Sequence, residues 1–337
     1  MKKILIIKLS AIGDVVMSLS MIDALQKYYG NVHITWLCGK IVAPVLHEIE
    51  GLDKIITLNE SNLFSHLKTV QLKELLTVWK KLSFKKFDKI IIGHTDWRYR
   101  LLSLPILAHE KVSFGYKRHH NLPLGTRFHG VDYVQLATDE AFIKSYDLIY
   151  PNIKLEKFKN DLLDYKREKI LLFPGGANNT LSEQFLRRWD ILNYQKLANI
   201  LIENEFQVII AGARSDNWVS EYFNSKVLNL IGQTNLLETI SLIRESDLVV
   251  THDSGPLHLS LYLTKKKTIA LFGPVLSEAR IPENCNEAIV MKSKIYLNCM
   301  PCYDGHNFTK CEDNVCMKNI NVEDVYNKVI KELKVKK

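Results

Sequence analysis

The stretch ESDLVVTHDSGPLHLSLYL, residues 245–263, predicts a strand, a tight polar turn and a helix in succession. An apolar run at 248–250 leads into the turn at 251–255, and Pro256 then opens a second apolar segment. Proline suits the first turn of a helix because its missing N–H would have no partner there. A helix start carries unpaired N–H groups and partial positive charge, and both favour a phosphate. Gly255, which has no Cβ, would let a ligand approach the backbone closely.

The polar side chains of this stretch allow two interpretations. In the first, Asp253 accepts hydrogen bonds from sugar hydroxyls, and His258, about one turn into the helix, faces the same ligand. In the second, Asp253-Ser254-Gly255 is an ordinary Asx turn beside a buried histidine, because these residue types are common in turns. The stretch by itself leaves both a nucleotide site and a plain turn open.

The composition indicates a two-domain globular protein that favours anionic partners. A chain of 337 residues is longer than one typical core allows, and its 47% hydrophobic and 24% charged residues are not those of a disordered protein. The formal net charge of +8 favours nucleotides, phosphorylated lipids or an acidic membrane face, although a solvated lysine-rich surface would carry the same charge. There is no zinc finger, RNA-binding signature or alternation of aromatic and basic residues, so nucleic acid is not an expected partner.

The apolar segments are too short to cross a membrane, since none reaches 18 residues. The beginning, MKKILIIKLSAIGD, looks like a signal peptide for a few residues only. Lys8 and Asp14 interrupt its apolar part, and no small-residue cleavage site follows. We therefore expect a cytoplasmic protein.

Strand-length apolar segments alternate with helical patterns along the whole chain. In the first half, strands are predicted at 3–9, 32–38, 54–58, 87–93 and 111–115, and helices at 15–29, 42–49, 67–82, 97–108 and 137–148. A charged, aperiodic segment at 151–167 marks a linker. In the second half, strands are predicted at 169–173, 206–211, 227–230, 248–250 and 268–272, and helices at 191–203, 217–224 and 236–245.

This alternation predicts an α/β fold with two doubly wound parallel sheets. The expected domains are 1–160 and 161–337. The last helix, 322–335, is expected in the second domain, with packing back on the first domain as an alternative.

The first strand-to-helix turn, KLSAIGD, carries a candidate base. It has one glycine where a dinucleotide fingerprint has three, which argues against a nicotinamide enzyme. Right-handed crossovers place such turns along one edge of the sheet, where open sheets bind ligands. There the carboxylate of Asp14 could take a proton from a substrate hydroxyl. The alternative is that Asp14 is the N-cap of the first helix.

Turns of the second domain carry residues that suit a nucleotide. Gly175 and Gly176 follow a strand and could approach a ligand closely. Arg187 and Arg188 could bind a diphosphate through their guanidinium groups, although surface arginines before a helix are the alternative. Asp216, after a further strand, could bind ribose hydroxyls.

Four of the six cysteines are close together near the C-terminus, in the pattern Cys299-x2-Cys302-x8-Cys311-x4-Cys316. Four thiolates could hold one structural zinc or iron ion, and the first spacing is standard for such a site. The alternative is a loop of reduced thiols. No activating base is evident nearby, so a catalytic cysteine is not expected.

Several motifs together resemble glycosyltransferase family 9, the ADP-heptose:lipopolysaccharide heptosyltransferases. They are KLSAIGDVVMSLSMIDAL at the N-terminus, PGGAN and RRW in the middle, and THDSGPLHLS followed by FGP. Order and spacing agree over nearly the whole chain, and Asp-Ser-Gly-x-x-His is the most specific part. The resemblance implies a GT-B architecture of two facing Rossmann-like domains, with the acceptor in the first and the nucleotide sugar in the second. It also implies an inverting transfer that requires no cofactor.

The resemblance assigns roles to residues. Asp14 matches the general base, and Asp216 falls near an acidic ribose contact. Arg187 stands where a phosphate-binding lysine is usual, so a planar fork replaces a point charge. The predicted donor site comprises Gly175, Gly176, Arg187, Arg188, Asp216, Asp253, Ser254, Gly255 and His258.

A basic segment of the first domain is the expected docking site for an anionic, lipid-linked core saccharide. It contains Lys117, Arg118, His119, His120 and Arg127. The residues beside Asp14 that complete the predicted acceptor site are Ser10 and Gly13. The overall charge would help to hold the enzyme at the inner face of the cytoplasmic membrane. A solvated basic loop is the alternative interpretation of this segment.

The predicted reaction is the transfer of a heptose from ADP-heptose to an inner-core lipopolysaccharide acceptor. Three alternatives stay open at this point. They are the same chemistry on a protein or another glycan, a sugar-nucleotide epimerase on the same architecture, and a nucleotide-binding module without catalysis. The presence of Asp14, far in sequence from the donor motif, argues against the last of these.

Overall fold

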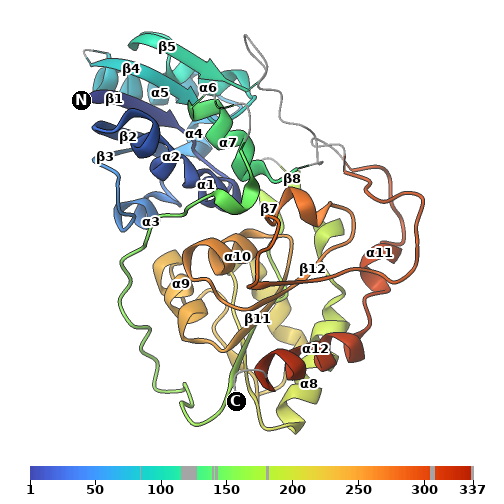
Figure 1. Cartoon of the computed structure of the whole chain (residues 1–337). Helices are drawn as coiled ribbons and strands as arrows, with labels where there is room; N and C mark the ends of the chain where they lie inside the picture. Colours follow the sequence, from blue (N-terminus) through green and yellow to red (C-terminus); the bar gives the residue numbers. More distant parts are fainter. Residues whose placement is uncertain are drawn as a thin grey trace. The chain divides into compact units, whose positions relative to one another are not determined.

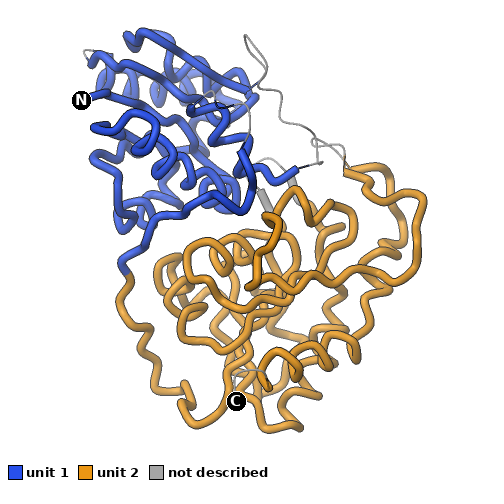
Figure 2. Tube along the Cα trace, in the orientation of Figure 1, with its two compact units in different colours: residues 1–123, 127–154 blue, residues 124–126, 155–337 orange. Residues whose placement is uncertain are grey.

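The computed structural model describes residues 1–83, 85–114, 127–138, 140, 143–179, 182–303 and 308–334. Within this part, the chain forms two compact units, which Figure 2 shows in different colours. Unit 1 ends at Lys154, and unit 2 runs from Leu155 to the C-terminal helix. No helix of the described residues is long and apolar enough to cross a bilayer.

Unit 1 is built on a five-stranded parallel sheet in the order β3-β2-β1-β4-β5 (Figure 1). The strands are β1 (Lys2–Ile7), β2 (Val32–Gly39), β3 (Lys54–Leu58), β4 (Lys86–Ile92) and β5 (Leu107–Ser113). The central strands are continuous apolar runs because helices cover both faces of a doubly wound sheet. In β1, for example, Ile4 to Ile7 are fully buried, and Ile4 lies opposite Ile34 of β2 and Lys89 of β4.

The helices of unit 1 are α1 (Ile12–Ser18), α2 (Ser20–Tyr29), α3 (Ala43–His47), α4 (Glu60–Leu63), α5 (Lys68–Leu82), α6 (Trp97–Leu102) and α7 (His129–Thr138), with a 3-10 turn η1 (Ser145–Asp147). Three sequence-based expectations are corrected here. The helix expected at 15–29 begins at Ile12 and is divided at Leu19. The helix expected at 97–108 ends before Pro105, which cannot continue a helix, so that β5 begins at Leu107. The helix expected at 137–148 is α7, earlier in the chain.

Unit 2 contains a six-stranded parallel sheet in the order β10-β9-β6-β11-β12-β13, and a small antiparallel pair (Figure 1). The parallel strands are β6 (Lys169–Phe173), β9 (Gln207–Ile210), β10 (Leu228–Asn229), β11 (Leu248–His252), β12 (Thr268–Leu271) and β13 (Ala288–Met291), and the antiparallel pair is β7 (Asn178–Asn179) and β8 (Ser182–Glu183). β13 was not predicted, although its sequence AIVM is a short apolar run; it is an edge strand in which only Ile289 is buried.

The helical segments of unit 2 are η2 (Phe185–Arg187), α8 (Ile191–Glu203), η3 (Arg214–Tyr222), α9 (Leu236–Glu245), α10 (Gly255–His258), η4 (Leu259–Leu263), η5 (Ser277–Ala279), α11 (Val315–Lys318) and α12 (Val322–Lys334). Trp189 lies in the core and donates its indole N–H to the carbonyl of Ile320. α12 buries Val325, Val329 and Leu333 in the same core, beside α8. Its apolar face is therefore covered within unit 2, as expected for a helix of the second domain.

The boundary between the units falls at Lys154, earlier than the expected boundary at 160. Residues 155–168 are attached to unit 2 by their backbone. Gln207 of β9 bonds the carbonyl of Leu162 and the N–H of Asp164, and Arg244 of α9 bonds the carbonyls of Leu155 and Glu156. A lysine-rich, aperiodic segment suggested a linker, but its carbonyl groups are ordered by side chains of unit 2.

Candidate active site

Each sheet has one point where the strand order reverses, and open parallel sheets bind ligands at the carboxyl ends of the strands there. In unit 1 this point lies between β1 and β4, and in unit 2 between β6 and β11. Polar side chains follow three of these strands, and a glycine turn follows the fourth. Asp14 comes after β1 and His94 after β4, while Gly176 comes after β6 and Asp253 after β11.

Asp14 is the third residue of α1, whose N-cap is Ala11. The interpretation of Asp14 as the N-cap is therefore wrong. Its side chain is 39% exposed, and its Oδ2 lies 3.2 Å from Nζ of Lys8, whose side chain is only 1% exposed. Ser10 beside it is half-buried and Gly13 is buried in the helix. The turn therefore presents the solvent-accessible carboxylate of Asp14, which is paired with the buried ammonium of Lys8.

Two further titratable groups lie around Lys8. Glu60 of α4 is buried against Gly39, where a Cβ would meet the Glu60 carboxylate at 1.9 Å. Burial raises the pKa of Glu60, while a hydrogen bond from Ser10 and the charge of Lys8 oppose that rise. His94 follows β4, and burial together with the charge of Lys8 lowers its pKa to about 4. At neutral pH this histidine is therefore uncharged.

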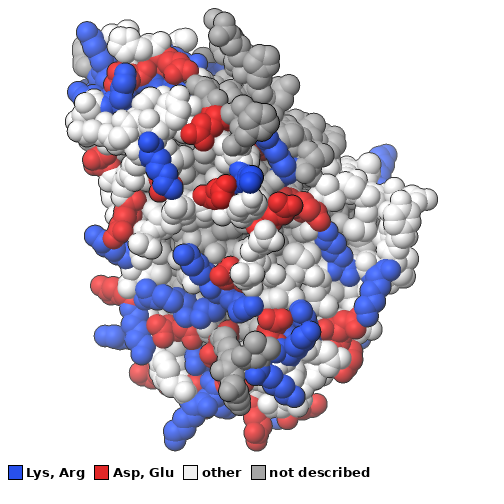
Figure 3. All heavy atoms as spheres, in the orientation of Figure 1, with Lys and Arg blue, Asp and Glu red and all other residues white. Residues whose placement is uncertain are grey.

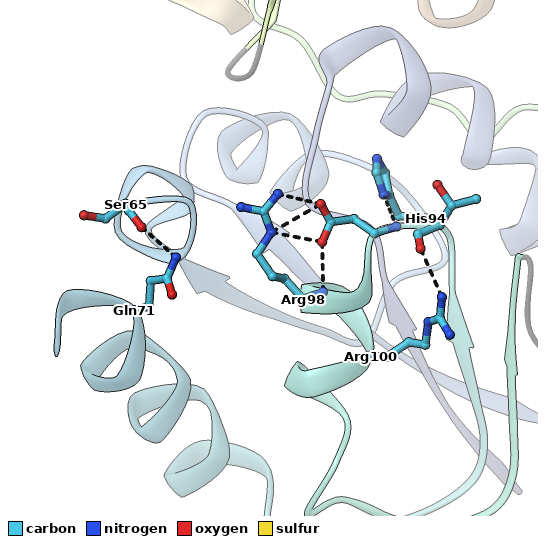
Figure 4. Close-up of polar contacts among 7 residues, drawn as sticks. Ser65, Gln71, His94, Arg98 and Arg100 are labelled. Atoms are coloured by element: carbon cyan, nitrogen blue, oxygen red, sulfur yellow. Dashed lines mark hydrogen bonds and ion pairs between the residues drawn. The ribbon is translucent and has the colours of Figure 1, made fainter. Parts of the chain in front are cut away.

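The turn from β4 to α6 holds its side chains in a fixed network (Figure 4). The N–H of Asp96 donates to Nδ1 of His94 at 2.9 Å, and the ring of His94 stacks on Tyr99 with centroids 4.4 Å apart. Asp96 caps α6 and also binds Arg98, with Nη2 and Oδ2 2.6 Å apart. Arg98 in turn lies 4.4 Å from the ring centroid of Phe64. A polar segment directly after an apolar strand, the signal that found Asp14, also marks this turn, yet the prediction missed it.

The basic segment predicted to bind the acceptor is only partly described. Lys117, Arg118, His119 and His120 lie outside the described residues. Arg127 is described, and it binds the buried carboxylate of Asp132 and, at 2.7 Å, Oε1 of Gln135. Burial raises the pKa of Asp132 to about 7 against the opposing charge of Arg127. The guanidinium is thus engaged within unit 1, and its acceptor role stays a prediction.

The described surface charges do not gather into one patch on the face drawn in Figure 3. There lysines and arginines are interspersed with aspartates and glutamates among the described residues. On this face, the arrangement resembles the solvated surface that was the alternative explanation of the net charge.

Asp253 is the centre of the polar cluster in unit 2. Its side chain is 3% exposed, and its Oδ2 lies 3.1 Å from Nη1 of Arg187 and 3.4 Å from Nε of Arg280. Nε2 of His258 lies 3.8 Å from Oδ1. Burial alone would raise the pKa of Asp253, but Arg187 and Arg280 hold it well below its usual range. The sequence reasoning missed Arg280, which follows η5, because no motif surrounds it.

This cluster carries more positive than negative charge, since two guanidinium groups surround one carboxylate. Nε of Arg187 and Nδ1 of His258 are buried without a hydrogen-bond partner in the described part of the chain. The guanidinium of Arg187 lies over the rings of Tyr303 and Phe308, whose centroids are 5.2 and 5.5 Å from its Cζ. The arrangement suits an anion. Asp253 is buried among cations, and its Oδ1 has no hydrogen-bond partner among the described residues, so the sugar contact predicted for it stays a prediction.

The turn after β6 is shaped by contacts with Asp216. The carboxylate of Asp216 is buried and accepts from the N–H groups of Gly176 and Ala213, each at 2.9 Å. A Cβ on Gly175 would lie 2.5 Å from Cγ of Asp216, and Gly176 has a φ of +80°. The glycines are therefore needed for internal packing and backbone conformation. Each oxygen of Asp216 thus accepts one backbone hydrogen bond, and the ribose contact predicted for this residue stays a prediction.

Arg188 also stabilises this turn. Its Nε donates to the carbonyl of Gly176 at 2.8 Å, and its Cζ lies 5.4 Å from the ring centroid of Trp218. Of the two arginines, Arg187 therefore contacts the carboxylate of Asp253, while Arg188 stabilises the turn after β6. The interpretation of both as mere surface arginines is wrong, because both make specific contacts.

The helix after β11 is shorter than predicted. Gly255 and Pro256 begin α10, with Ser254 as its N-cap, but the α-helical part ends at His258 and continues as the π-helical segment η4. Oγ of Ser254 lies 3.3 Å from the carbonyl of His252. His258 is buried one turn into the segment, beside Asp253, as the motif suggested. The turn is therefore more than a plain Asx turn.

Described residues of the cysteine segment lie beside Arg187, in the polar cluster around Asp253. Tyr303 and Phe308, which contact Arg187, form a β-bridge within it, and the N–H of Cys302 donates to the carbonyl of Pro274. Burial, and then the neighbouring Cys302 and Cys311 thiols, raise the pKa of Cys316 to about 11. Among the described residues, no group of three or more His, Cys, Asp or Glu side chains is placed to hold a metal ion. The structural metal at Cys299, Cys302, Cys311 and Cys316 stays a prediction.

Comparisons with known proteins agree with this arrangement. A model of the family described as Glycosyltransferase family 9 (heptosyltransferase) matches residues 75–311. The lipopolysaccharide core heptosyltransferase OpsX of Haemophilus influenzae is 28% identical over 280 residues, which cover 77% of this chain and 76% of that protein. The lipooligosaccharide heptosyltransferase 2 of Campylobacter jejuni is 28% identical over 333 residues, covering 96% of this chain and 95% of that protein.

The fold is also similar to that of solved structures. The structure of ADP-heptose lps heptosyltransferase II of E. coli matches with a TM-score of 0.74 at 20% identity, covering 100% of this chain and 99% of that chain. The GT-B fold class predicted from the sequence is thereby confirmed, with one Rossmann-like sheet in each unit.

Proposed function

Because the chain belongs to glycosyltransferase family 9, we propose that it moves a heptose from ADP-heptose to an inner-core lipopolysaccharide acceptor with inversion at the anomeric carbon. The observation that carries this proposal is Asp14, a solvent-accessible carboxylate at the point of strand reversal in unit 1. A glycosyltransferase needs such a base to take the proton from the acceptor hydroxyl.

The chemistry requires one stabilised leaving group and one activated nucleophile. As the acceptor oxygen bonds to the anomeric carbon, the bond to the diphosphate breaks and negative charge develops on ADP. Arg187 and Arg280 are held in place before the reaction by Asp253, so they can stabilise that charge without reorganising. The acceptor proton passes to Asp14. In this proposal the protein's own cations serve the diphosphate, and no cofactor takes part in the transfer.

The acceptor of the proposed reaction is an anionic, lipid-linked saccharide at the inner face of the cytoplasmic membrane. The relatives act, by name, on lipopolysaccharide or lipooligosaccharide. The net charge of +8 supports attraction to an anionic acceptor and to an acidic membrane surface. The basic segment with Lys117, Arg118 and Arg127 is the proposed docking region for this acceptor.

Mass spectrometry of the products tests the proposal directly. Purified protein, ADP-heptose and lipopolysaccharide acceptors truncated before the first and before the second heptose should yield ADP and a product heavier by one heptose. Release of ADP with added mass on a protein or a different glycan would instead establish the alternative acceptor. An epimer has the same mass as its substrate, so a change in the NMR spectrum of the sugar nucleotide without ADP release would establish an epimerase and contradict transfer.

A further inference from the structure

Lys8 is an unusual residue in the unit 1 sheet because it is a charged side chain in the position of a core residue. It follows the last residue of β1, and its side chain is 1% exposed. Its stem packs on Gly93, whose added Cβ would lie 3.4 Å from Cδ of Lys8, and the indole N–H of Trp36 donates to its carbonyl. The backbone and stem of Lys8 are thus fixed by both neighbouring strands.

The charged end of Lys8 points to the turn that carries the proposed base. Nζ lies 3.2 Å from Oδ2 of Asp14 and 5.7 Å from the ring centroid of Tyr133. Burying an ammonium is costly unless an opposite charge offsets the loss of water. Asp14, at 39% exposure, keeps part of its contact with water, whereas Lys8 has lost nearly all of its own. The pair therefore costs more than a surface ion pair would, and this cost indicates a role beyond stability.

We propose that Lys8 is a positioning residue for the general base: its ammonium binds Oδ2 of Asp14 and fixes the orientation in which the carboxylate meets the acceptor hydroxyl. This inference rests on the proposed function. In the transfer step the O–H bond of the acceptor breaks, the proton bonds to the carboxylate of Asp14, and the acceptor oxygen bonds to the anomeric carbon as ADP leaves. The proton then passes to solvent, which reaches Asp14.

Other titratable groups near Lys8 also affect the pH dependence of the reaction. They are Glu60 of α4, His94 and Asp96 of the β4–α6 turn, Arg98 and Tyr99 of α6, and Tyr133 of α7. The charge of Lys8 lowers the pKa of Glu60, against the larger effect of burial. Burial and the charge of Lys8 both lower the pKa of His94, which is therefore uncharged at neutral pH. Removal of Lys8 should therefore also make His94 easier to protonate, which provides an internal check on the charge of Lys8.

The test compares Lys8→Met with Lys89→Met. Lys89 is the matched control because it is also buried, lies in the neighbouring strand β4 and pairs with a carboxylate, Glu110, at 3.5 Å. Lys8→Met should lower kcat/KM at pH 7 by about tenfold to a hundredfold, the loss expected when a base is misplaced by about 1 Å. The acidic limb of the pH–rate profile should move toward neutral pH by about one unit or more. Lys89→Met should change neither.

Two further variants separate alignment from charge and from folding. Lys8→Gln keeps a donor for Oδ2 and should recover part of the rate, while the acidic limb stays displaced. In an Asp14→Asn background, Lys8→Met should cost less than twofold, because two residues that act as a unit are not additive. ADP affinity, measured by calorimetry, should stay unchanged in all of them. A full, additive loss in the Asp14→Asn background would overturn the proposal.

A spectroscopic measurement keeps this inference separable from the proposed function. The carboxyl ¹³C resonance of Asp14, assigned by its absence in Asp14→Asn, should titrate at higher pH in Lys8→Met than in the wild type. If the wild type transfers no heptose but this displacement is seen, the proposed donor or acceptor is wrong and the Lys8–Asp14 pair stands. An unchanged titration in folded Lys8→Met would overturn the pair, whatever the substrate.

Discussion

The polar centres of the two units have opposite arrangements of charge. In unit 1 the cation, Lys8, is buried and the carboxylate of Asp14 is accessible. In unit 2 the carboxylate, Asp253, is buried and the cations Arg187 and Arg280 surround it. Both centres lie where the strand order of their sheet reverses. Similar sheets thus present different groups at equivalent places.

The difference shows how one architecture can serve two chemical tasks. A base must be reached by its substrate and must keep a defined orientation, so its partner is the buried member of the pair. An anion receptor must offer positive charge, so there the carboxylate is buried and holds the guanidinium groups apart from one another. The comparison makes distinct predictions for the two units.

The largest effect is expected from Asp14→Asn, which removes the accessible carboxylate of unit 1. The rate should fall by about 10² or more, the range for loss of general base catalysis. ADP affinity should stay near that of the wild type. The control is Asp23→Asn, because Asp23 is also an acidic residue in the first turn of its helix, paired there with Lys27. Activity of Asp14→Asn within a few-fold of wild type would remove the base from unit 1 and with it the comparison.

The next effect concerns Arg280, the cation of unit 2 that no motif predicted. Loss of a charge-assisted hydrogen bond is worth about 1.5–3 kcal/mol, so Arg280→Met should weaken ADP binding by about 10- to 100-fold in calorimetry. Arg187 remains as a partner of Asp253, so the variant should fold. Arg167→Met, which removes an exposed arginine paired with Asp164, is the matched control. Equal ADP affinity in Arg280→Met and wild type would show that unit 2 does not receive the anion there.

A third prediction uses the neutral histidine of unit 1. His94 has its pKa lowered to about 4, so between pH 6.5 and 4 the unfolded chain binds more protons than the folded one. Its contribution to the free energy of unfolding is complete above pH 6.5 and is lost as the pH falls toward 4, by at most about 3 kcal/mol. His94→Gln should therefore show a flatter decline of Tm with acidification. His109→Gln, at an exposed position of β5, should leave the decline unchanged, and an equally steep decline in His94→Gln would contradict the burial argument.

The smallest effect on transfer is expected from the cysteine segment. If the four late cysteines hold a structural ion, elemental analysis of tag-free protein should find about one zinc or iron per chain. Cys302→Ser should weaken ADP binding by only a few-fold, because Cys302 precedes Tyr303, which stacks on Arg187. Cys285→Ser, outside the four, should have no effect. Absence of metal, with four freely reactive thiols, would contradict the structural ion. The segment would then serve only to contact Arg187 through Tyr303 and Phe308.

The sequence predicted the two sheets and the principal polar residues after β1 and β11, because both depend on local patterns. Buried parallel strands are continuous apolar runs, and the turns after them carry the first polar residues. What it missed depends on distant contacts. The role of Arg280 is visible only from the 3.4 Å distance between its Nε and Oδ2 of Asp253. Lys8 was taken as an interruption of an apolar segment, and its burial becomes visible only in the fold. The sequence also missed that Asp216 joins two separate turns by accepting a backbone N–H from each of them.

The attachment of residues 155–168 to unit 2 matters for anyone who wishes to divide this enzyme. A fragment that begins at 161, the boundary suggested by composition, would lack Phe158, which is buried, and the carbonyl partners of Arg244 at Leu155 and Glu156. A fragment that begins at 155 keeps all of these. The shorter fragment should therefore be the poorer expression target, and chimaeras that exchange halves between relatives should join their parents before Leu155.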